Sequence, residues 1–329
     1  MPPLEFSPFF TTRFQVNFPE IMSKTALLFA GQGAQVVGMG QDLATAFPTA
    51  KAWFDRANAA LGYDLTSICF TGPEADLTKT ENAQPGIFLV SWVALELLKE
   101  RVPALKFEAT AGLSLGEFTA LTAAGAMRFE DGLRVVRQRG RFMQEACEVT
   151  KGGMAAVIGL DEAPTREVCA EAGVVLANLN CPGQLVISGE AEKIGKACEL
   201  AKAKGAKRAI PLPVAGAYHS PLMASAQPKL AAELAKAKLS TPLVPVISNV
   251  SGQPHTTPDQ IAARMVEQVT SSVRWEESMR YLLAQGYTRF IELGPGAALS
   301  GFMKRINKEV QMLNVADVAS LETTVKALS

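Results

Sequence analysis

Short runs of β-forming residues alternate with longer helical patterns from about residue 24 to the end of the chain. The runs at 25–30, 107–112 and 289–293 are typical of buried strands, and glycine ends or follows each of them. Parallel strands need long connections, so this alternation predicts an α/β fold with a largely parallel sheet. The chain has 329 residues, 48% hydrophobic and 19% charged, which is enough for a globular body with a sizeable core.

The middle of the chain follows a different order. Strand patterns at 154–158, 174–179, 184–188 and 208–212 are separated by helical patterns at 163–172 and 191–204. This β-α-β-β-α-β order is that of a ferredoxin-like unit. We therefore expect a large α/β body, made of residues 24–150 and 216–329, that carries the catalytic residues. A ferredoxin-like α+β subdomain at 151–215 is inserted into it.

Residues 1–23 differ from the rest because they are rich in proline and phenylalanine and almost uncharged. They lack the charged start and apolar run of a secretory signal, and Arg13 as the only basic residue is a poor match to a transit peptide. A leader remnant, an artificial addition and an N-terminal arm all remain open.

The longest apolar run, 86–98, is shorter than the roughly 20 residues that span a bilayer, so it predicts a buried helix and no membrane segment. Five scattered cysteines without a CxxC pair indicate buried thiols in a reducing compartment, with neither a disulfide framework nor a metal site.

Charge and histidine content limit the chemistry. Thirty-two basic and thirty-two acidic residues give a net charge of zero, which argues against a protein that coats nucleic acid but allows a local basic patch. The only two histidines are His219 and His255. A multi-histidine metal cage is therefore excluded, and a histidine base must be one of these two.

The segment Gly112-Leu113-Ser114-Leu115-Gly116 matches the G-x-S-x-G nucleophile elbow, with a predicted strand before it and a helix after it. Small residues are needed there because the serine lies on a sharp turn. The Leu115 N–H and the helix N-terminus then face a developing oxyanion. Alternatively, Ser114 and Glu117 form a capping box, which explains both residues but not both glycines.

A serine nucleophile needs a base within hydrogen-bonding distance. His219 lies in segment 213–221, where a strand end is followed by small residues and a helix start, a place at which α/β enzymes present histidine to a cleft. His255 lies in a polar loop and is expected to be solvated. We therefore predict His219 as the base.

Arg139 falls inside the apolar stripe of a helix predicted at 131–147. A guanidinium directed into the core needs a carboxylate or carbonyl partner, because an unpaired buried charge is strongly destabilising. Two interpretations remain open: a buried ion pair with Asp or Glu, and a bidentate clamp for a substrate carboxylate.

The loop at 29–35 begins like a dinucleotide fingerprint, but Val36 stands where the third glycine belongs. A nicotinamide cofactor is therefore not expected, and no other cofactor is indicated. In enzymes with a nucleophile elbow, the loop after an early strand supplies the second oxyanion donor, and the Gln32 N–H is the candidate here.

Five ordered motifs together resemble the malonyl-CoA:acyl carrier protein transacylase family, over nearly the whole chain from Lys24 onward. They lie at 29–35, 112–117, 139–144, 217–223 and 294–296. The resemblance implies an α/β-hydrolase-like body with a ferredoxin-like subdomain, and an acyltransferase that takes malonyl-CoA and acyl carrier protein as partners in fatty acid synthesis. It implies a ping-pong reaction through a malonyl-serine.

The resemblance also assigns roles. Ser114 is the nucleophile, His219 the base, and Arg139 the partner of the malonyl carboxylate, while the Gln32 and Leu115 amides form the oxyanion hole. The family uses a backbone carbonyl in place of an acidic triad member, and Gln268 occupies the matching position. Asn180 and Asn249 correspond to positions that line the pocket.

Two residues depart from the family pattern. Leu113 stands where many members have histidine, as in similar sequences from photosynthetic lineages, and Ala30 replaces a usual proline. The likeness at Leu113 suggests a plastid or cyanobacterial source, so we expect the plastid stroma, or the cytoplasm if the source is bacterial. We also expect a soluble monomer without nucleic-acid or membrane partners.

Two other functions remain to be weighed. A serine hydrolase could use the same elbow, although a buried Arg139 has no evident role in a simple esterase. A non-catalytic carrier-binding module could dock an acidic protein on the basic residues between Lys193 and Arg208, which could equally be an ordinary solvated helix face.

Overall fold

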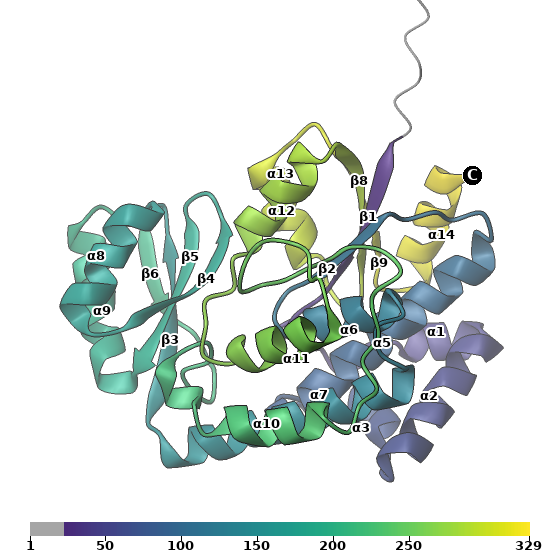
Figure 1. Ribbon diagram of the computed structural model, residues 1–329, viewed down its shortest axis with the longest axis horizontal. Coiled ribbons are helices and arrows are strands. Elements are labelled where there is room, and N and C mark those ends of the chain that lie inside the picture. Colours follow the sequence, from purple (N-terminus) through teal and green to yellow (C-terminus); the bar gives the residue numbers. More distant parts are fainter. Residues whose placement is uncertain (1–22) are drawn as a thin grey trace, which may run out of the picture.

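The computed structural model describes residues 23–329 (Figure 1). The larger of its two sheets has five parallel strands in the order β7-β2-β1-β8-β9. These strands are β1 (Lys24–Phe29), β2 (Ala109–Gly112), β7 (Val246–Ile247), β8 (Tyr287–Leu293) and β9 (Gln311–Val315). The predicted α/β class is confirmed.

Both faces of this sheet are covered by helices, which is why β1, β2 and β7 are almost entirely buried. In β1, Leu27 and Phe29 point into one core and Ala26 and Leu28 into the other. The first core is built mainly with α2 (Pro48–Leu61), α5 (Thr80–Arg101), α6 (Leu115–Ala123), α7 (Phe129–Val149) and α10 (Ala226–Leu234). The second core is built with α12 (Trp275–Ala284) and α13 (Ala298–Ile306).

The apolar run at 86–98 lies inside α5, which is buried over most of its length. None of the helices within residues 23–329 is long and apolar enough to cross a membrane. The other helical segments of the large body are α1 (Gln41–Ala46), α3 (Leu65–Thr71), α4 (Glu74–Leu77), the 3-10 turn η1 (Pro221–Met223), α11 (Pro258–Glu267) and α14 (Val318–Leu328).

The smaller sheet has four antiparallel strands in the order β4-β5-β3-β6 and lies beside the body, at the left of Figure 1. Its elements are β3 (Gly152–Ile158), α8 (Glu162–Ala172), β4 (Val175–Cys181), β5 (Gln184–Glu190), α9 (Ala191–Ala203) and β6 (Arg208–Pro211). Val157, Leu185 and Ile187 belong to a separate core. The predicted β-α-β-β-α-β order is confirmed.

A backbone connection joins the small sheet to the body. The Leu179 N–H donates to the Val273 carbonyl at 2.9 Å, and the Val273 N–H donates to Ala177 at 2.8 Å. The Ser272 hydroxyl donates to the carbonyl of Leu176. Residues 272–273 of the body thus pair with β4, which fixes the small sheet against the loop that follows α11.

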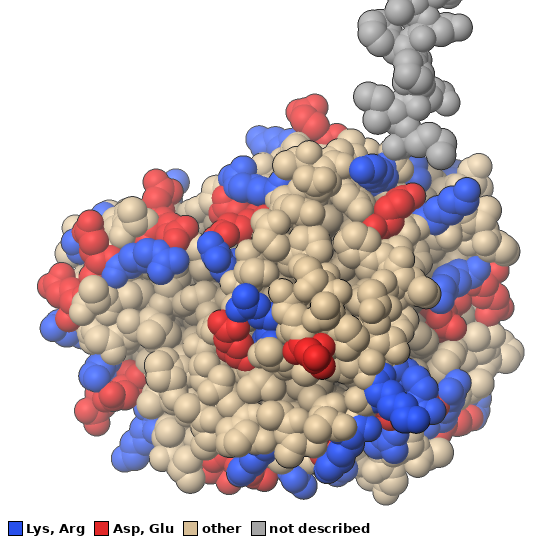
Figure 2. All heavy atoms as spheres, viewed as in Figure 1, with Lys and Arg blue, Asp and Glu red and all other residues tan. Residues whose placement is uncertain are grey.

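The remaining sequence expectations concern the cysteines, the surface and the N-terminus. All five cysteines are buried and free, as predicted. Figure 2 shows basic and acidic side chains interspersed around one face of the protein, with a broad uncharged area between them. The predicted leader or arm at 1–23 lies outside the described residues, apart from Ser23.

Close packing at the start of α6 requires glycine. A Cβ on Gly112 would lie 1.9 Å from the carbonyl carbon of Gly116, and one on Gly116 would lie 2.2 Å from the Phe29 carbonyl oxygen. Real Cβ atoms do not approach other atoms so closely. The two glycines of the elbow motif are therefore needed for the helix to begin directly against the end of β1.

Gly116→Ala is expected to lower the free energy of unfolding by about 1–3 kcal/mol, because the added methyl group collides with β1. Gly195→Ala is the control, since Gly195 lies in α9 with open space around it. That change is expected to stabilise the protein by about 0.5–1 kcal/mol. Urea unfolding measures both values, and equal effects would contradict the packing argument.

Candidate active site

Ser114 lies on the turn between β2 and α6, with an unusual backbone conformation of φ 54° and ψ −104°. Its side chain makes no capping hydrogen bond to α6, so the capping-box alternative is wrong. Instead, Ser114 Oγ lies 2.8 Å from His219 Nε2. The turn directs the hydroxyl away from the helix and toward the imidazole, as the elbow motif requires.

His219 follows β6 and comes just before η1, and it too has a positive φ, of 56°. Its Nδ1 lies 2.9 Å from the Gln268 carbonyl oxygen and 3.2 Å from that of Ser271. Because both partners are acceptors, Nδ1 carries the proton and Nε2 is free to accept one from Ser114. Burial, and to a lesser extent the charge of Arg139, lowers the pKa of His219 from 6.5 to about 4.

Arg139 in α7 is only 1% exposed, and its guanidinium lies over the Phe118 ring at 5.4 Å. Nη1 donates to Gln84 Oε1 at 2.7 Å. Nη2 donates to Gln268 Oε1 at 2.9 Å and to Ser114 Oγ at 3.0 Å.

The side-chain partners of Arg139 within residues 23–329 are all neutral, so the buried-ion-pair interpretation is wrong. Burial lowers the pKa of Arg139 to about 10, so the guanidinium is still charged at neutral pH. A buried cation held only by neutral groups next to a serine hydroxyl is suited to attract an anion.

Asn249 is fully buried and braces the turn that carries Ser114. Its Oδ1 accepts from the Ser114 N–H at 2.6 Å, and its Nδ2 donates to the Gly112 carbonyl at 2.8 Å.

Asn180 lies near the end of β4, which extends two residues beyond the predicted strand. No hydrogen bond within the described chain joins Asn180 to Ser114 or His219, and its buried Oδ1 has no partner there.

Gln32 reaches the site through Gln84, whose Nε2 donates to Gln32 Oε1 at 3.2 Å. The preceding Gly31 packs so tightly that a Cβ there would lie 2.6 Å from the Leu113 carbonyl oxygen. The loop after β1 is thus pressed against the nucleophile turn. Within the described residues the backbone N–H groups of Gln32 and Leu115 form no hydrogen bond, so both are available as donors.

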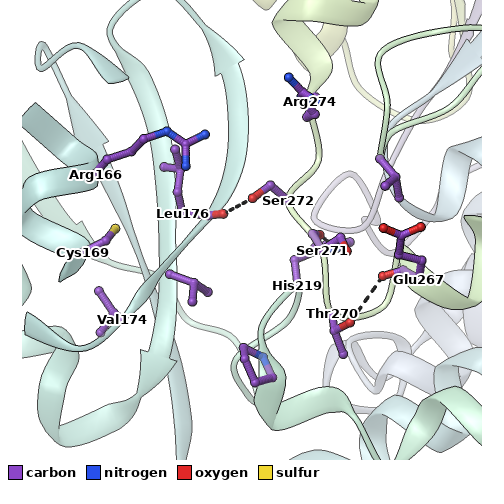
Figure 3. A pocket seen from close by; sticks show the side chains of 13 residues that line it. Arg166, Cys169, Val174, Leu176, His219, Glu267, Thr270, Ser271, Ser272 and Arg274 are labelled. Carbon is purple, nitrogen blue, oxygen red and sulfur yellow. Dashed lines mark hydrogen bonds between the residues drawn. The ribbon is translucent and has the colours of Figure 1, made fainter. Parts of the chain in front are cut away.

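A cavity of about 670 Å³ lies between the small sheet and the body, and His219 lines it. Figure 3 shows Arg166 and Leu176 on the side of the small sheet, with Ser271 and Glu267 on the opposite side. His219 is thus the residue of the Ser114–His219–Arg139 group that borders the cavity between the two sheets.

The sequence was compared with known proteins. It matches the acyl transferase domain family over residues 26–326. It is 46% identical over 312 residues to the malonyl CoA-acyl carrier protein transacylase of Bacillus subtilis, covering 93% of this chain and 98% of that protein. Identity to the Escherichia coli transacylase is 44% over 292 residues, or 87% of this chain and 93% of that protein. The chain belongs to the malonyl CoA-acyl carrier protein transacylase family.

Solved structures of this transacylase family have the same fold. The acyl-carrier-protein-S-malonyltransferase of Bartonella henselae has a TM-score of 0.88 at 40% identity, covering 93% of this chain and 99% of that one. A malonyl-transacylase in complex with its type II PKS acyl-carrier protein has a TM-score of 0.90 at 38% identity, covering 93% and 100%. The family predicted from the five motifs is confirmed.

In this transacylase family member, a further sequence expectation about the site is wrong. His255 is buried, not solvated, and its Nε2 lies 2.7 Å from Glu117 Oε1. Sequence reasoning also missed Gln84, which holds Arg139, and Ser271, which contacts His219. Gln84 gave little signal because it lies in the polar first part of α5, close to Thr80, Glu81 and Asn82. Ser271 acts through its main chain and leaves no signal.

The lowered pKa of His219 predicts the pH dependence of Ser114 reactivity. The neutral imidazole accepts the serine proton, so labelling of Ser114 by a fluorophosphonate should be constant from roughly pH 6 to 8. The rate should fall at lower pH with a midpoint near 4, not near 6.5. A midpoint near 6.5 would contradict the burial argument.

This experiment needs a control for folding. The unfolded chain binds the His219 proton at higher pH than the folded one, so stability falls as the pH drops from 6.5 toward 4. Circular dichroism at each pH must therefore show that the protein being labelled is folded.

Proposed function

We propose that the protein transfers a malonyl group from malonyl-CoA to the phosphopantetheine thiol of acyl carrier protein, supplying extender units for fatty acid synthesis. The observation that carries this proposal is the buried Arg139 guanidinium, 3.0 Å from Ser114 Oγ and held by two neutral glutamines. Its Nε has no partner within residues 23–329, so it has unused donor capacity. A cation at this distance from a nucleophile favours an acyl group that carries its own carboxylate.

The first half-reaction acylates the serine. His219 Nε2 accepts the hydroxyl proton while Ser114 Oγ attacks the thioester carbon, and the Gln32 and Leu115 amides stabilise the oxyanion. The intermediate collapses as the carbon–sulfur bond breaks. The CoA sulfur leaves with the proton from His219, and the malonyl group remains as an ester on Ser114.

The second half-reaction runs the same chemistry with another thiol. The carrier thiol gives its proton to His219 and attacks the ester carbon, and the serine oxygen then leaves with that proton. Arg139 holds the malonyl carboxylate through both steps. The main-chain carbonyl of Gln268 keeps the imidazole in the tautomer that each step needs, and Asn249 keeps the nucleophile turn in place.

The names of the relatives support both partners. Malonyl CoA and acyl carrier protein are the substrates in the names of the Bacillus subtilis and Escherichia coli relatives. A structural relative was solved bound to a type II PKS acyl-carrier protein. A monomeric state, a plastid or bacterial cytoplasmic location, and an enzyme without nucleic-acid or membrane partners stay predictions from the sequence.

The serine intermediate is tested by intact-protein mass spectrometry after incubation with malonyl-CoA and no carrier protein. We expect a single malonyl adduct on Ser114 and one equivalent of CoA released in a burst. Ser114→Ala should form no adduct, because the attacking oxygen is gone. Continuous CoA release without carrier would identify a hydrolase and contradict the proposal.

The clamp is tested by the ratio of malonyl to acetyl loading. Arg139→Ala should reduce this ratio about 10- to 100-fold, because a charged hydrogen bond to the carboxylate contributes roughly 1.5–3 kcal/mol. Arg141→Ala is the control, since Arg141 lies two residues away in α7 and is exposed. Equal use of malonyl-CoA and acetyl-CoA by the unmodified enzyme would exclude a carboxylate clamp.

A further inference from the structure

Glu117 is a buried carboxylate that the proposed reaction does not use. It lies in the first turn of α6 and is 1% exposed. Its Oε2 accepts from Gln268 Nε2 at 2.6 Å and from the Asn249 N–H at 3.1 Å. Its Oε1 lies 2.7 Å from His255 Nε2. A buried carboxylate is unfavourable unless hydrogen bonds satisfy it, and here three partners distant in sequence do so. This arrangement indicates a specific structural or functional role for Glu117.

One of these partners leads to the nucleophile. Glu117 fixes the backbone of Asn249, and the Asn249 side chain holds the Ser114 N–H and the Gly112 carbonyl. Ser114 is in a backbone region that L-residues rarely adopt, so the turn persists only where its surroundings hold it. The two hydrogen bonds of the Asn249 side chain hold one side of this turn in place.

A second partner leads to the base and to the clamp. Gln268 Nε2 donates both to Glu117 and, at 3.0 Å, to the Ser114 carbonyl. The other end of the same amide accepts from Arg139 Nη2, and the Gln268 main-chain carbonyl accepts from His219 Nδ1. Fixing the Gln268 side chain therefore orients the amide that Arg139 contacts, next to the carbonyl that holds His219.

Glu117 also balances the buried charge of Arg139 without pairing with it. The Gln268 amide lies between them, with its oxygen toward the guanidinium and its nitrogen toward the carboxylate. The negative charge raises the pKa of Arg139 and so opposes the effect of burial. A direct ion pair would instead occupy the donors that a substrate carboxylate needs.

The third partner, His255, comes from the loop between β7 and α11, which is anchored by the His255 N–H to the Val246 carbonyl at 2.9 Å. Its side chain is fully enclosed, and the Nε2–H donates to the carboxylate oxygen that faces away from Gln268 and Asn249. His255 thus fixes the rotation of the Glu117 carboxylate, which decides where its other oxygen lies.

We propose that Glu117 is a positioning residue that holds the nucleophile, the base and the clamp in one arrangement, and that His255 fixes its carboxylate. The proposal rests on the proposed function for the identity of the acyl group. Neither residue touches the substrate, and both act through Asn249 and Gln268.

Glu117→Gln is the first test. Glutamine has nearly the shape of glutamate, but its side-chain nitrogen donates and cannot accept a hydrogen bond. That nitrogen would face one of the three N–H donors that contact the Glu117 carboxylate. Glu292→Gln is the matched control, since Glu292 is also buried but accepts from the start of α13. We expect the kcat for Ser114 acylation to fall about 100-fold in the first variant and less than twofold in the second.

The preference for malonyl over acetyl separates positioning from stability. Loss of the Gln268 contact releases Arg139, so Glu117→Gln should lower the malonyl-to-acetyl ratio at a temperature at which circular dichroism shows both variants folded. If kcat and this ratio match those of Glu292→Gln, Glu117 has only a structural role and the proposal is wrong.

His255 gives a second test that does not alter Glu117. His255→Gln keeps an N–H that can reach the carboxylate, whereas His255→Leu removes it with a similar volume. We expect the glutamine variant to keep at least half of the wild-type kcat and the leucine variant to lose about tenfold or more. Equal kcat values for the two variants would overturn the role of His255.

A fluorophosphonate that labels Ser114 distinguishes failure of this proposal from failure of the proposed function. If the wild-type protein forms no malonyl adduct, the function is wrong, but slower labelling of Glu117→Gln than of Glu292→Gln still supports the positioning role. If the wild type forms the adduct and the two variants are labelled equally fast, the function stands and the positioning role is overturned.

Discussion

The buried positive charge of Arg139 is the constraint on which the site depends. An isolated guanidinium in the interior is destabilising by several kcal/mol unless other groups satisfy it. Here two glutamine oxygens, an aromatic face and a serine hydroxyl do so, and no carboxylate within the described residues pairs with it directly. Glu117 is separated from it by the amide of Gln268. The cation is thus stabilised, yet it still has capacity for an incoming anion.

Backbone strain is concentrated at the two reacting residues. Ser114 and His219 are the only non-glycine residues with positive φ in the described part of the chain. Each such conformation is unfavourable by roughly 1–3 kcal/mol. Buried side chains of Asn249 and Gln268 bond both peptide groups of Ser114, while the His219 ring is held through main-chain carbonyls. The strain places the hydroxyl and the imidazole 2.8 Å apart.

Local patterns were sufficient to predict the α/β alternation, the ferredoxin-like order, the elbow serine and the buried position of Arg139. They failed where the answer depends on contacts distant in sequence. His255 was expected to be solvated because its partner Glu117, which lies 138 positions away, cannot be found from the local sequence. The partners of Arg139 could not be predicted either. An apolar stripe on a helix shows that a side chain is buried, but it does not show whether amides or carboxylates surround that side chain. Gln84 and Gln268 come from two different helical regions that only the fold brings together.

The same cation explains why the residue whose main-chain carbonyl orients the histidine has a neutral side chain. Gln268 Oε1 lies 2.9 Å from Arg139 Nη2, so a carboxylate at this position would form an ion pair with the guanidinium. That pair would compete with the substrate carboxylate for the same donors and would place a second negative charge beside Glu117. A neutral amide avoids both effects, and its own backbone carbonyl then serves His219. Selecting an anionic acyl group and orienting the base are therefore two demands that a single glutamine meets.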